Sequence, residues 1–133
     1  MRIARGRAEG AATEERGPTF TGRVLVDPVL AAEGGVGVNN VFFEPGARTH
    51  WHTHAIGQVL YVTHGAGFVR RRDGTGGAIR GGDVVHIAAG EEHWHGAAPD
   101  SYLLHVAVSL GDAEWLDAVT DEDYAAAVGE AAG

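Results

Sequence analysis

Between Phe20 and Leu110, every apolar run is short and is interrupted by Gly, Pro, Asp or Asn. Short runs at regular spacing, with turn residues between them, predict an all-β barrel or sandwich rather than a helical fold. The predicted strands are 20–26, 38–43, 49–54, 58–63, 67–72, 76–80, 83–88, 93–97 and 102–108. The segment DGTG between two of them predicts a hairpin turn, because Gly supplies a positive φ there.

The two ends of the chain differ from this central region. A length of 133 residues favours one domain with one core. Residues 1–17 show no periodicity and are expected to form a flexible arm, whereas 18–110 should form the barrel. Residues 111–133 are expected to form an acidic, partly helical tail, in which Thr120 and Asp123 resemble a capping box. The preceding segment AEWLDAV predicts a further short turn of helix.

The composition limits the kind of metal site that the chain can form and its expected location in the cell. Cysteine is absent, so a metal site would have to use nitrogen and oxygen ligands. No apolar run approaches the roughly 20 residues that a membrane span needs. The first residues lack the apolar core of a secretory signal. A cytoplasmic location is therefore expected, without disulfide or thiolate chemistry.

The net charge of −8 comes almost entirely from the C-terminal tail. Residues 111–133 hold seven acids and no base, whereas residues 1–110 hold eleven acids and ten bases. Nucleic acids and anionic membranes are disfavoured as partners, because the chain lacks the basic patch that would neutralise phosphates. A small molecule is the expected partner.

All eight histidines lie between positions 50 and 105. Side chains alternate along a strand, so His52 and His54 should point to the same side about 7 Å apart. His93 and His95 repeat the pattern on another predicted strand, and Gln58 should face the interior as well. Buried polar groups without partners cost about 1 to 3 kcal/mol each. A divalent cation bound among them would remove that cost.

The spacing of these residues resembles the two sequence motifs of the cupin family. Gly46, His52-x-His54, Gln58 and Gly65 match the first motif, with Gln58 where glutamate is usual. The second motif is matched by Gly82, Ala88-x-Gly90 and His93, with Ala88 for the usual proline and Ala97 for the usual asparagine. The resemblance implies a single-domain cupin, a double-stranded β-helix or jelly-roll barrel, with a short C-terminal helix. It also implies metal ligation by His52, His54, Gln58 and His93.

A narrower resemblance covers most of the chain. The segments EPGARTHWHTHAIGQ, GDVVHIAAGEEHWHGAAP and LLHVAV are similar to small bacterial cupins that include manganese-dependent hydroxynitrile lyases. Those enzymes reversibly cleave a cyanohydrin to a carbonyl compound and hydrogen cyanide. Small cupins also include polyketide cyclases or isomerases, metal-dependent dioxygenases and proteins that only bind a small ligand. These alternatives stay open.

The ligands implied by the resemblance are all neutral, so a divalent metal would keep its full charge. That favours Lewis-acid chemistry and disfavours oxidation to a trivalent ion, which weakens the dioxygenase alternative. One divalent transition metal is expected, and Mn is favoured. Nitrogen and oxygen ligands also suit Fe, Co, Ni or Zn.

Two further histidines could move protons in such a site. His105 and His95 are the predicted acid and base groups, because imidazole titrates near neutral pH. Predicted substrate contacts are Thr49, Asn39, Val41, Leu60 and Ser109. The Thr49 hydroxyl could equally be tied to the backbone.

The remaining histidines and the tryptophans beside the proposed ligands are expected to lie outside the site. His50 lies at the start of its strand and is not expected to serve the site, His64 is expected in solvent, and His86 could face either layer. Trp51 and Trp94 have the opposite parity to the neighbouring ligands and are expected to pack. A homodimer or higher homo-oligomer is expected because the edge strands of a small barrel need cover.

Overall fold

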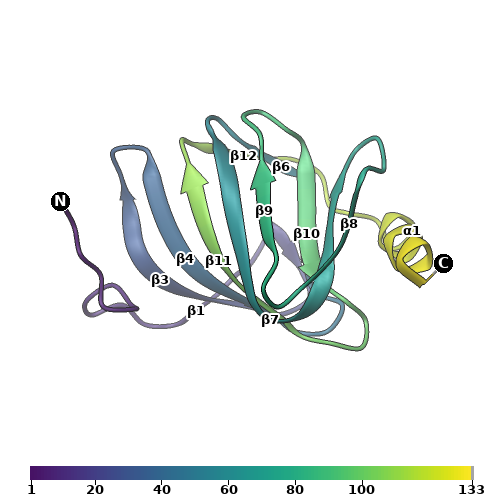
Figure 1. The fold of residues 1–133 in the computed structure, drawn as a ribbon, viewed down its shortest axis with the longest axis horizontal. Helices are drawn as coiled ribbons and strands as arrows, with labels where there is room; N and C mark the ends of the chain where they lie inside the picture. The colour runs from purple at the N-terminus through teal and green to yellow at the C-terminus, as the bar shows by residue number, and fades with distance from the viewer. Residues whose placement is uncertain (133) are drawn as a thin grey trace.

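The computed structural model describes residues 1–132 and contains a curled sheet that forms a half-barrel, with one helix beside it (Figure 1). The strands are β1 (Glu14–Glu15), β2 (Phe20–Thr21), β3 (Val24–Glu33), β4 (Val36–Phe43), β5 (Arg48–Thr49), β6 (His52–His54), β7 (Gly57–Arg71), β8 (Gly76–Arg80), β9 (Val84–Ile87), β10 (His93–Ala97), β11 (Leu103–Leu110) and β12 (Ala113–Trp115). The helix is α1 (Asp121–Ala132). The all-β prediction with a short C-terminal helix is confirmed.

The strands pair antiparallel in the order β1-β3-β4-β11-β7-β10-β5-β2. β8 and β9 both pair with β7, and β6 pairs with β10 and β12. β7 therefore joins two halves of the sheet, which curl toward each other around one interior (Figure 1). Strands far apart in the sequence, such as β6 and β10, meet on one side of that interior.

The sequence predicted two strands, at 58–63 and 67–72, where the structure has the single strand β7. A shift in the register between β11 and β7 leaves Thr63 as an extra residue. The Thr63 hydroxyl donates a hydrogen bond to the Leu104 carbonyl, 3.2 Å away. Such a bulge lets one strand bend and continue, which local residue preferences do not reveal.

This bulge also changes which side chains of β7 face inward. Before it, the even-numbered Leu60 and Val62 are fully buried in the interior. After it, Val69 packs against the interior, and the even-numbered Phe68 belongs to a cluster on the outside of the sheet. One continuous strand thus serves both halves of the fold.

Three other predicted elements differ from the structure. The predicted strand 20–26 is divided into β2 and β3, and β3 continues to Glu33. The predicted strand 49–54 is divided into β5 and β6, which are separated by His50 and Trp51. The predicted turn of helix in AEWLDAV is wrong, because residues 113–115 form β12 and pair with β6. Backbone hydrogen bonds to β6 outweigh the local preference of this short segment for a helix.

Apolar side chains form two clusters, one on each side of the sheet. The inner cluster comprises Val24, Val26, Val41, Phe43, Ala47, Leu60, Val62, Ile79, Ile87, Ala97, Leu103 and Ala107. The outer cluster comprises Trp51, Phe68, Trp94, Ala98, Val119 and Ala127, with Leu116, Tyr124 and Val128 packed against it. The expectation that Trp51 and Trp94 are packing residues is confirmed.

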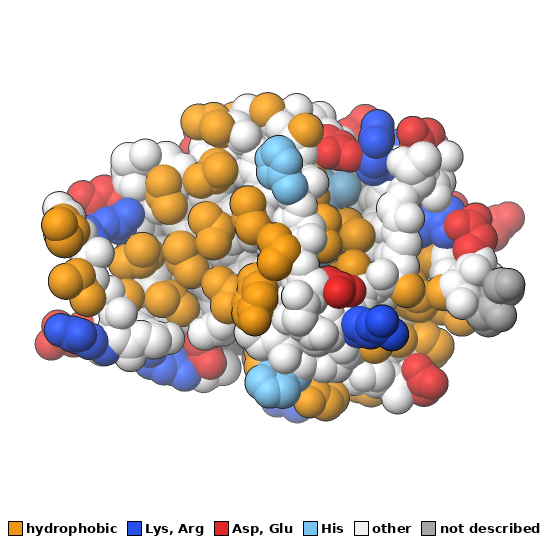
Figure 2. Space-filling model, viewed as in Figure 1, with side chains coloured by type: hydrophobic (Ala, Val, Ile, Leu, Met, Phe, Trp, Pro, Cys, Tyr) orange, Lys and Arg blue, Asp and Glu red, His pale blue; other side chains and the backbone are white. Residues whose placement is uncertain are grey.

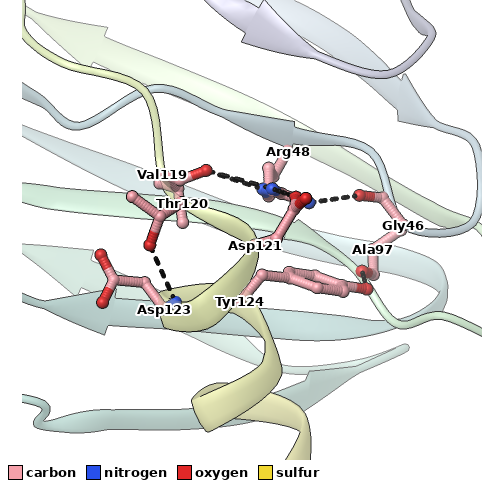
Figure 3. Close-up of polar contacts among 8 residues, drawn as sticks. All are labelled: Gly46, Arg48, Ala97, Val119, Thr120, Asp121, Asp123 and Tyr124. Carbon is pink, nitrogen blue, oxygen red and sulfur yellow. Dashed lines mark hydrogen bonds and ion pairs between the residues drawn. The ribbon is translucent and has the colours of Figure 1, made fainter.

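Helix α1 is held over the outer cluster by polar contacts (Figure 3). The Asp123 amide donates to the Thr120 hydroxyl at 3.0 Å, which is the predicted N-cap. Arg48, only 5% exposed, donates to the Val119 carbonyl at 3.1 Å and to Asp121 Oδ1 at 2.8 Å. The Arg48 guanidinium also lies 4.6 Å from the centre of the Tyr124 ring.

The N-terminal segment runs along β3. Residues Glu14 and Glu15 pair with Val26 and Leu25 as β1, and Arg7 forms an ion pair of 2.7 Å with Asp27. Among the described residues, no helix has the length and apolar character required to cross a membrane.

Candidate metal and substrate site

The register of the strands gathers the polar side chains at one end of the interior. His52 lies directly opposite His93 in the pairing of β6 with β10. On the other half of the sheet, Ser109 lies opposite Gln58. His105 is flanked by Val41 of β4 and Val62 of β7. Alternation along each strand directs these side chains to the concave side.

The imidazoles of this group lie close together. Nitrogen atoms of His52, His93 and His95 lie within 4.8 Å of one another. The ring centres of His52 and His93 are 4.2 Å apart, and the His54 ring is 5.0 Å from His52 and 5.7 Å from His93. All four imidazoles are at most 4% exposed. A single ion could be reached by several of them.

Backbone carbonyls orient two of these rings. His52 Nδ1 lies 2.9 Å from the His50 carbonyl, and His93 Nδ1 lies 2.8 Å from the Glu91 carbonyl. A carbonyl only accepts, so each Nδ1 carries the proton and donates it. In the neutral rings, Nε2 then holds a free lone pair directed into the interior. This is the usual orientation of a metal-ligating histidine.

The contact between His93 and Gln58 is the most informative one in the site. Gln58 donates from its amide nitrogen to the Ser109 hydroxyl at 3.1 Å, which turns the amide oxygen toward His93. That oxygen lies 3.2 Å from His93 Nε2. His93 Nε2 and the Gln58 amide oxygen are therefore two acceptors that face each other without a hydrogen between them. A cation bound by both would relieve the repulsion between their lone pairs. A metal ion fits this donor set.

Several buried nitrogen atoms also lack a protein partner. In the histidine group they are both ring nitrogens of His54, Nε2 of His95 and Nδ1 of His105; outside it, Trp51 Nε1 of the outer cluster also lacks one. An unsatisfied buried polar atom costs about 1 to 3 kcal/mol. Three neighbouring histidines with this defect are better explained by a ligand or ion than by packing alone.

Burial keeps these imidazoles neutral. Desolvation, followed by the nearby His93, lowers the pKa of His52 to about 2 and that of His54 to about 4. Desolvation also lowers the pKa of His93 and brings that of His105 to about 4. For His95, burial and then His105 hold the pKa well below its usual range. Neutral rings keep the lone pairs that a metal or a proton requires.

His95 and His105 form a hydrogen-bonded pair. His105 Nε2 lies 3.1 Å from His95 Nδ1. The Phe43 ring packs against both imidazoles, with its centre 5.3 Å from that of His105 and 5.8 Å from that of His95. His105 is fully buried and does not line the cavity, whereas His95 does. His105 can therefore act on a bound molecule only through His95.

A cavity of about 240 Å³ opens beside the histidines. Its walls are formed by Arg16, Thr19, Phe20, Val26, Asn39, Val41, Thr49, His52, His54, Gln58, His95, Ala107, Ser109 and Trp115. Of the predicted substrate contacts, Asn39, Val41, Thr49 and Ser109 lie in this wall. Leu60 does not, because it is fully buried in the inner cluster. The apolar side chains of the core leave the cavity open.

Six wall residues were not among the predicted contacts: Arg16, Thr19, Phe20, Val26, Ala107 and Trp115. Arg16 and Phe20 come from the N-terminal side of the barrel, and Trp115 comes from β12. The Trp115 ring stacks on His52 with 4.4 Å between centres and lies 5.5 Å from Phe20. No motif marked Arg16, Phe20 and Trp115, because they reach the cavity through the pairings of β1 with β3, of β2 with β5 and of β12 with β6.

The histidines expected outside the site stay at its margin or on the surface. His50 is half-buried, and its amide donates at 2.9 Å to the carbonyl of Thr19, a residue of the cavity wall. His64 and His86 are exposed on the convex side.

Comparison with known proteins identifies the fold and its relatives. No model of a known protein family matches the chain. The chain is 46% identical over 123 residues to an (R)-mandelonitrile lyase from Granulicella tundricola, covering 86% of this chain and 94% of that protein. It also resembles the crystal structure of a cupin-like protein from Thermotoga maritima, with 43% identity, a TM-score of 0.81 and coverage of 90% and 97% of the two chains. The chain belongs to the cupin family.

This cupin also shares its fold with a polyketide cyclase from Streptomyces resistomycificus, at 16% identity and a TM-score of 0.68 over 89% of each chain. That similarity concerns the fold alone. The similarity to a lyase supports enzymatic activity for this cupin. Its buried histidine cluster is consistent with metal binding, as in a metal-dependent cupin.

Proposed function

We propose that this cupin is a metal-dependent lyase that reversibly cleaves a cyanohydrin to an aldehyde or ketone and hydrogen cyanide. The support for this reaction is the 46% identity to an (R)-mandelonitrile lyase over nearly the whole of both chains. The polar cavity supports it independently, since it joins neutral acid and base groups to a candidate metal site.

The proposed metal ligands are His52, His54, Gln58 and His93. The observation that carries this proposal is the 3.2 Å contact between His93 Nε2 and the Gln58 amide oxygen, where two acceptors face each other. A bound divalent metal would supply Lewis-acid activation of a hydroxyl or carbonyl oxygen. We propose manganese as that metal, with Fe, Co, Ni or Zn as the other metals that such ligands accept.

His95 and His105 are the proposed proton-transfer residues. Nδ1 of His95 is held by His105, so the opposite atom of the ring, the unpartnered Nε2, is the one available to a substrate. When Nδ1 carries the proton, Nε2 accepts the proton of the substrate hydroxyl. The bond between the carbinol carbon and the nitrile carbon then breaks, and its electron pair leaves with cyanide. Return of the proton to cyanide gives hydrogen cyanide.

Thr49 is placed to assist that proton transfer. The His95 amide donates to the Thr49 hydroxyl oxygen at 3.3 Å, and the Thr49 side chain is almost fully buried. The backbone contact thus occupies the oxygen as an acceptor and leaves the hydroxyl hydrogen free. We propose that Thr49 donates this hydrogen to the oxygen of the substrate.

The size of the cavity favours a compact substrate. An engineered cavity of about 150 Å³ is sufficient for benzene. The cavity of about 240 Å³ in this cupin can therefore hold one ring with a short polar group, which is the size of an aromatic cyanohydrin.

The test is mandelonitrile cleavage by protein loaded separately with Mn, Fe, Co, Ni or Zn, followed by the absorbance of benzaldehyde. We expect metal-dependent cleavage, and a loss of about 100-fold or more in His105→Ala with its metal content intact. Turnover that His105→Ala retains would remove His105 from the mechanism. Absence of cleavage with every metal would refute the lyase proposal.

A second experiment separates the two possible sets of ligands. His95 belongs to the closest group of imidazoles, whereas His54 belongs to the proposed ligand set. We expect His54→Ala to lose the metal and His95→Ala to keep it, as measured by element analysis after dialysis. The reverse result would make His95 a ligand and leave His54 to contact the substrate.

We also propose that this cupin forms a homodimer through the convex side of its sheet. Figure 2 shows a broad apolar area over β3, β4, β11 and β7, and Tyr61, Val84, Tyr102 and Ile56 are each more than 40% exposed. A second copy would bring an equally uncharged surface, so the charge of −8 would not oppose contact there. A Tyr61→Glu/Val84→Glu variant should elute as a monomer in size-exclusion chromatography with light scattering; a monomeric wild type would refute the dimer.

A further inference from the structure

One charged side chain lies in the wall of the cavity. Arg16 is the only acid or base other than histidine among the lining residues of the described chain. The rest of the wall consists of neutral imidazoles, amides, hydroxyls and apolar groups, and burial holds the imidazoles neutral. Arg16 therefore sets the sign of the electrostatic potential on its side of the cavity.

The backbone fixes the position of Arg16. Its amide donates to the Val24 carbonyl at 2.8 Å, directly after the two pairs that β1 forms with β3. Phe20 pairs with Thr49 a few residues later. The segment between β1 and β2 is thus anchored at both ends. The Arg16 side chain is 37% exposed and also lines the cavity, so it is reachable from the cavity and from solvent.

The present partner of Arg16 is weakly held. Glu14 Oε2 lies 3.4 Å from Arg16 Nη1, and the Glu14 side chain is 53% exposed. Glu14 and Arg16 are two positions apart, so their side chains can meet on one side of an extended segment. An exposed pair of this kind contributes little stability, and another carboxylate can replace Glu14 at small cost.

The hollow next to Arg16 on the outside of the cavity is lined by acidic residues. This second hollow shares Arg16, Asn39 and Ser109 with the cavity and extends over the turn between β3 and β4. Glu33 and Asp112 lie in its wall. A carboxylate is repelled by these acids and attracted by Arg16, so its preferred position is at the boundary between the hollow and the cavity.

We propose that Arg16 binds a carboxylate of the substrate, and that this cupin acts on a small organic acid. The substrate's hydroxyl or carbonyl end lies against the histidines while its carboxylate replaces Glu14 on the guanidinium. This inference rests on the proposed function for the identity of the reacting end. Arg16 is a specificity-determining residue that contacts the substrate away from the reacting atoms.

The test measures binding by calorimetry to metal-loaded protein, with 4-formylbenzoate and its neutral analogue 4-formylbenzamide. Arg16→Met keeps the aliphatic part of the side chain and removes the charge. We expect it to weaken 4-formylbenzoate binding about tenfold and to leave 4-formylbenzamide binding unchanged. Glu14→Gln removes the competing carboxylate and should strengthen 4-formylbenzoate binding about two- to threefold.

Arg23→Met is the matched control, because Arg23 is also exposed and also pairs with glutamates but does not line the cavity. It should change neither affinity. Equal binding of 4-formylbenzoate by wild type and Arg16→Met would overturn the proposal and assign the carboxylate to the metal site. No binding of 4-formylbenzoate to wild type at millimolar concentration would also overturn it. Neither result depends on turnover, so failure of the lyase proposal is recognised separately.

Discussion

The two sides of β10 differ in whether their side chains find partners within the protein. On the concave side, His93 and His95 are buried among imidazoles, and His95 Nε2 has no partner in the protein. On the convex side, Trp94 is 1% exposed and packs with Tyr124 of α1 at 6.0 Å between ring centres. Neighbouring residues of one strand thus serve opposite purposes.

A small domain can carry a polar interior when its other side is well packed. The outer cluster and α1 stabilise the strands from behind through apolar contact. The concave side can then keep lone pairs unsatisfied and available to an ion, at a cost that the outer side offsets. Ligand binding and fold stability are therefore expected to respond to different substitutions within the same five-residue strand.

The largest effect is expected on the concave side. His52→Ala/His54→Ala removes two proposed ligands, so bound metal should be lost from the protein. Metal that binds only the folded chain raises the free energy of unfolding by about 2.7 kcal/mol at 100 times its Kd. The double variant should show none of this rise in chemical denaturation, whereas the wild type should show all of it.

Element analysis of the same samples provides the control. A double variant that still holds about one metal per chain would mean that other residues bind the ion. The concave side would then differ from the convex side in packing but not in metal binding by His52 and His54.

Trp94→Ala should have the next largest effect, now on stability. Replacing a buried aromatic side chain by Ala typically costs about 3 to 5 kcal/mol. Trp94 should follow this pattern because it joins the sheet to the helix. Urea denaturation of metal-free protein measures the loss. The rise on adding metal should persist in this variant, and its disappearance would show that the two sides are coupled.

A smaller loss is expected from Arg48→Met. Arg48 donates to the Val119 and Gly46 carbonyls, and Met cannot. Asp121 is fully exposed and stays hydrated without its partner, so the cost should be about 1 to 3 kcal/mol. Denaturation curves of Arg48→Met and of the exposed control Arg23→Met measure the difference. Equal stability of the two variants would contradict the role of Arg48 in holding α1.

Strand alternation explains what the sequence could predict and what it could not. Period-two spacing was sufficient to separate His52 and His54 from Trp51 and to place Trp94 outside, because local geometry alone decides the side of a strand. The bulge at Thr63 and the pairing of β12 with β6 depend on strands that are distant in the sequence. Trp115 reaches the cavity only through that pairing, and Arg16 only through β1.

The smallest expected effect concerns a single hydroxyl on the outer side. Tyr124 donates to the Ala97 carbonyl at 2.7 Å and is the polar link between α1 and β10 (Figure 3). Tyr124→Phe should lower the free energy of unfolding by about 1 kcal/mol, because the Ala97 carbonyl loses its side-chain donor while ring packing is kept. Tyr61→Phe is the control, since Tyr61 is 48% exposed and should lose almost nothing. A Tyr124→Phe variant as stable as Tyr61→Phe would mean that this hydrogen bond does not help to hold the helix, so that the outer side would depend still more on apolar contact than the polar concave side does.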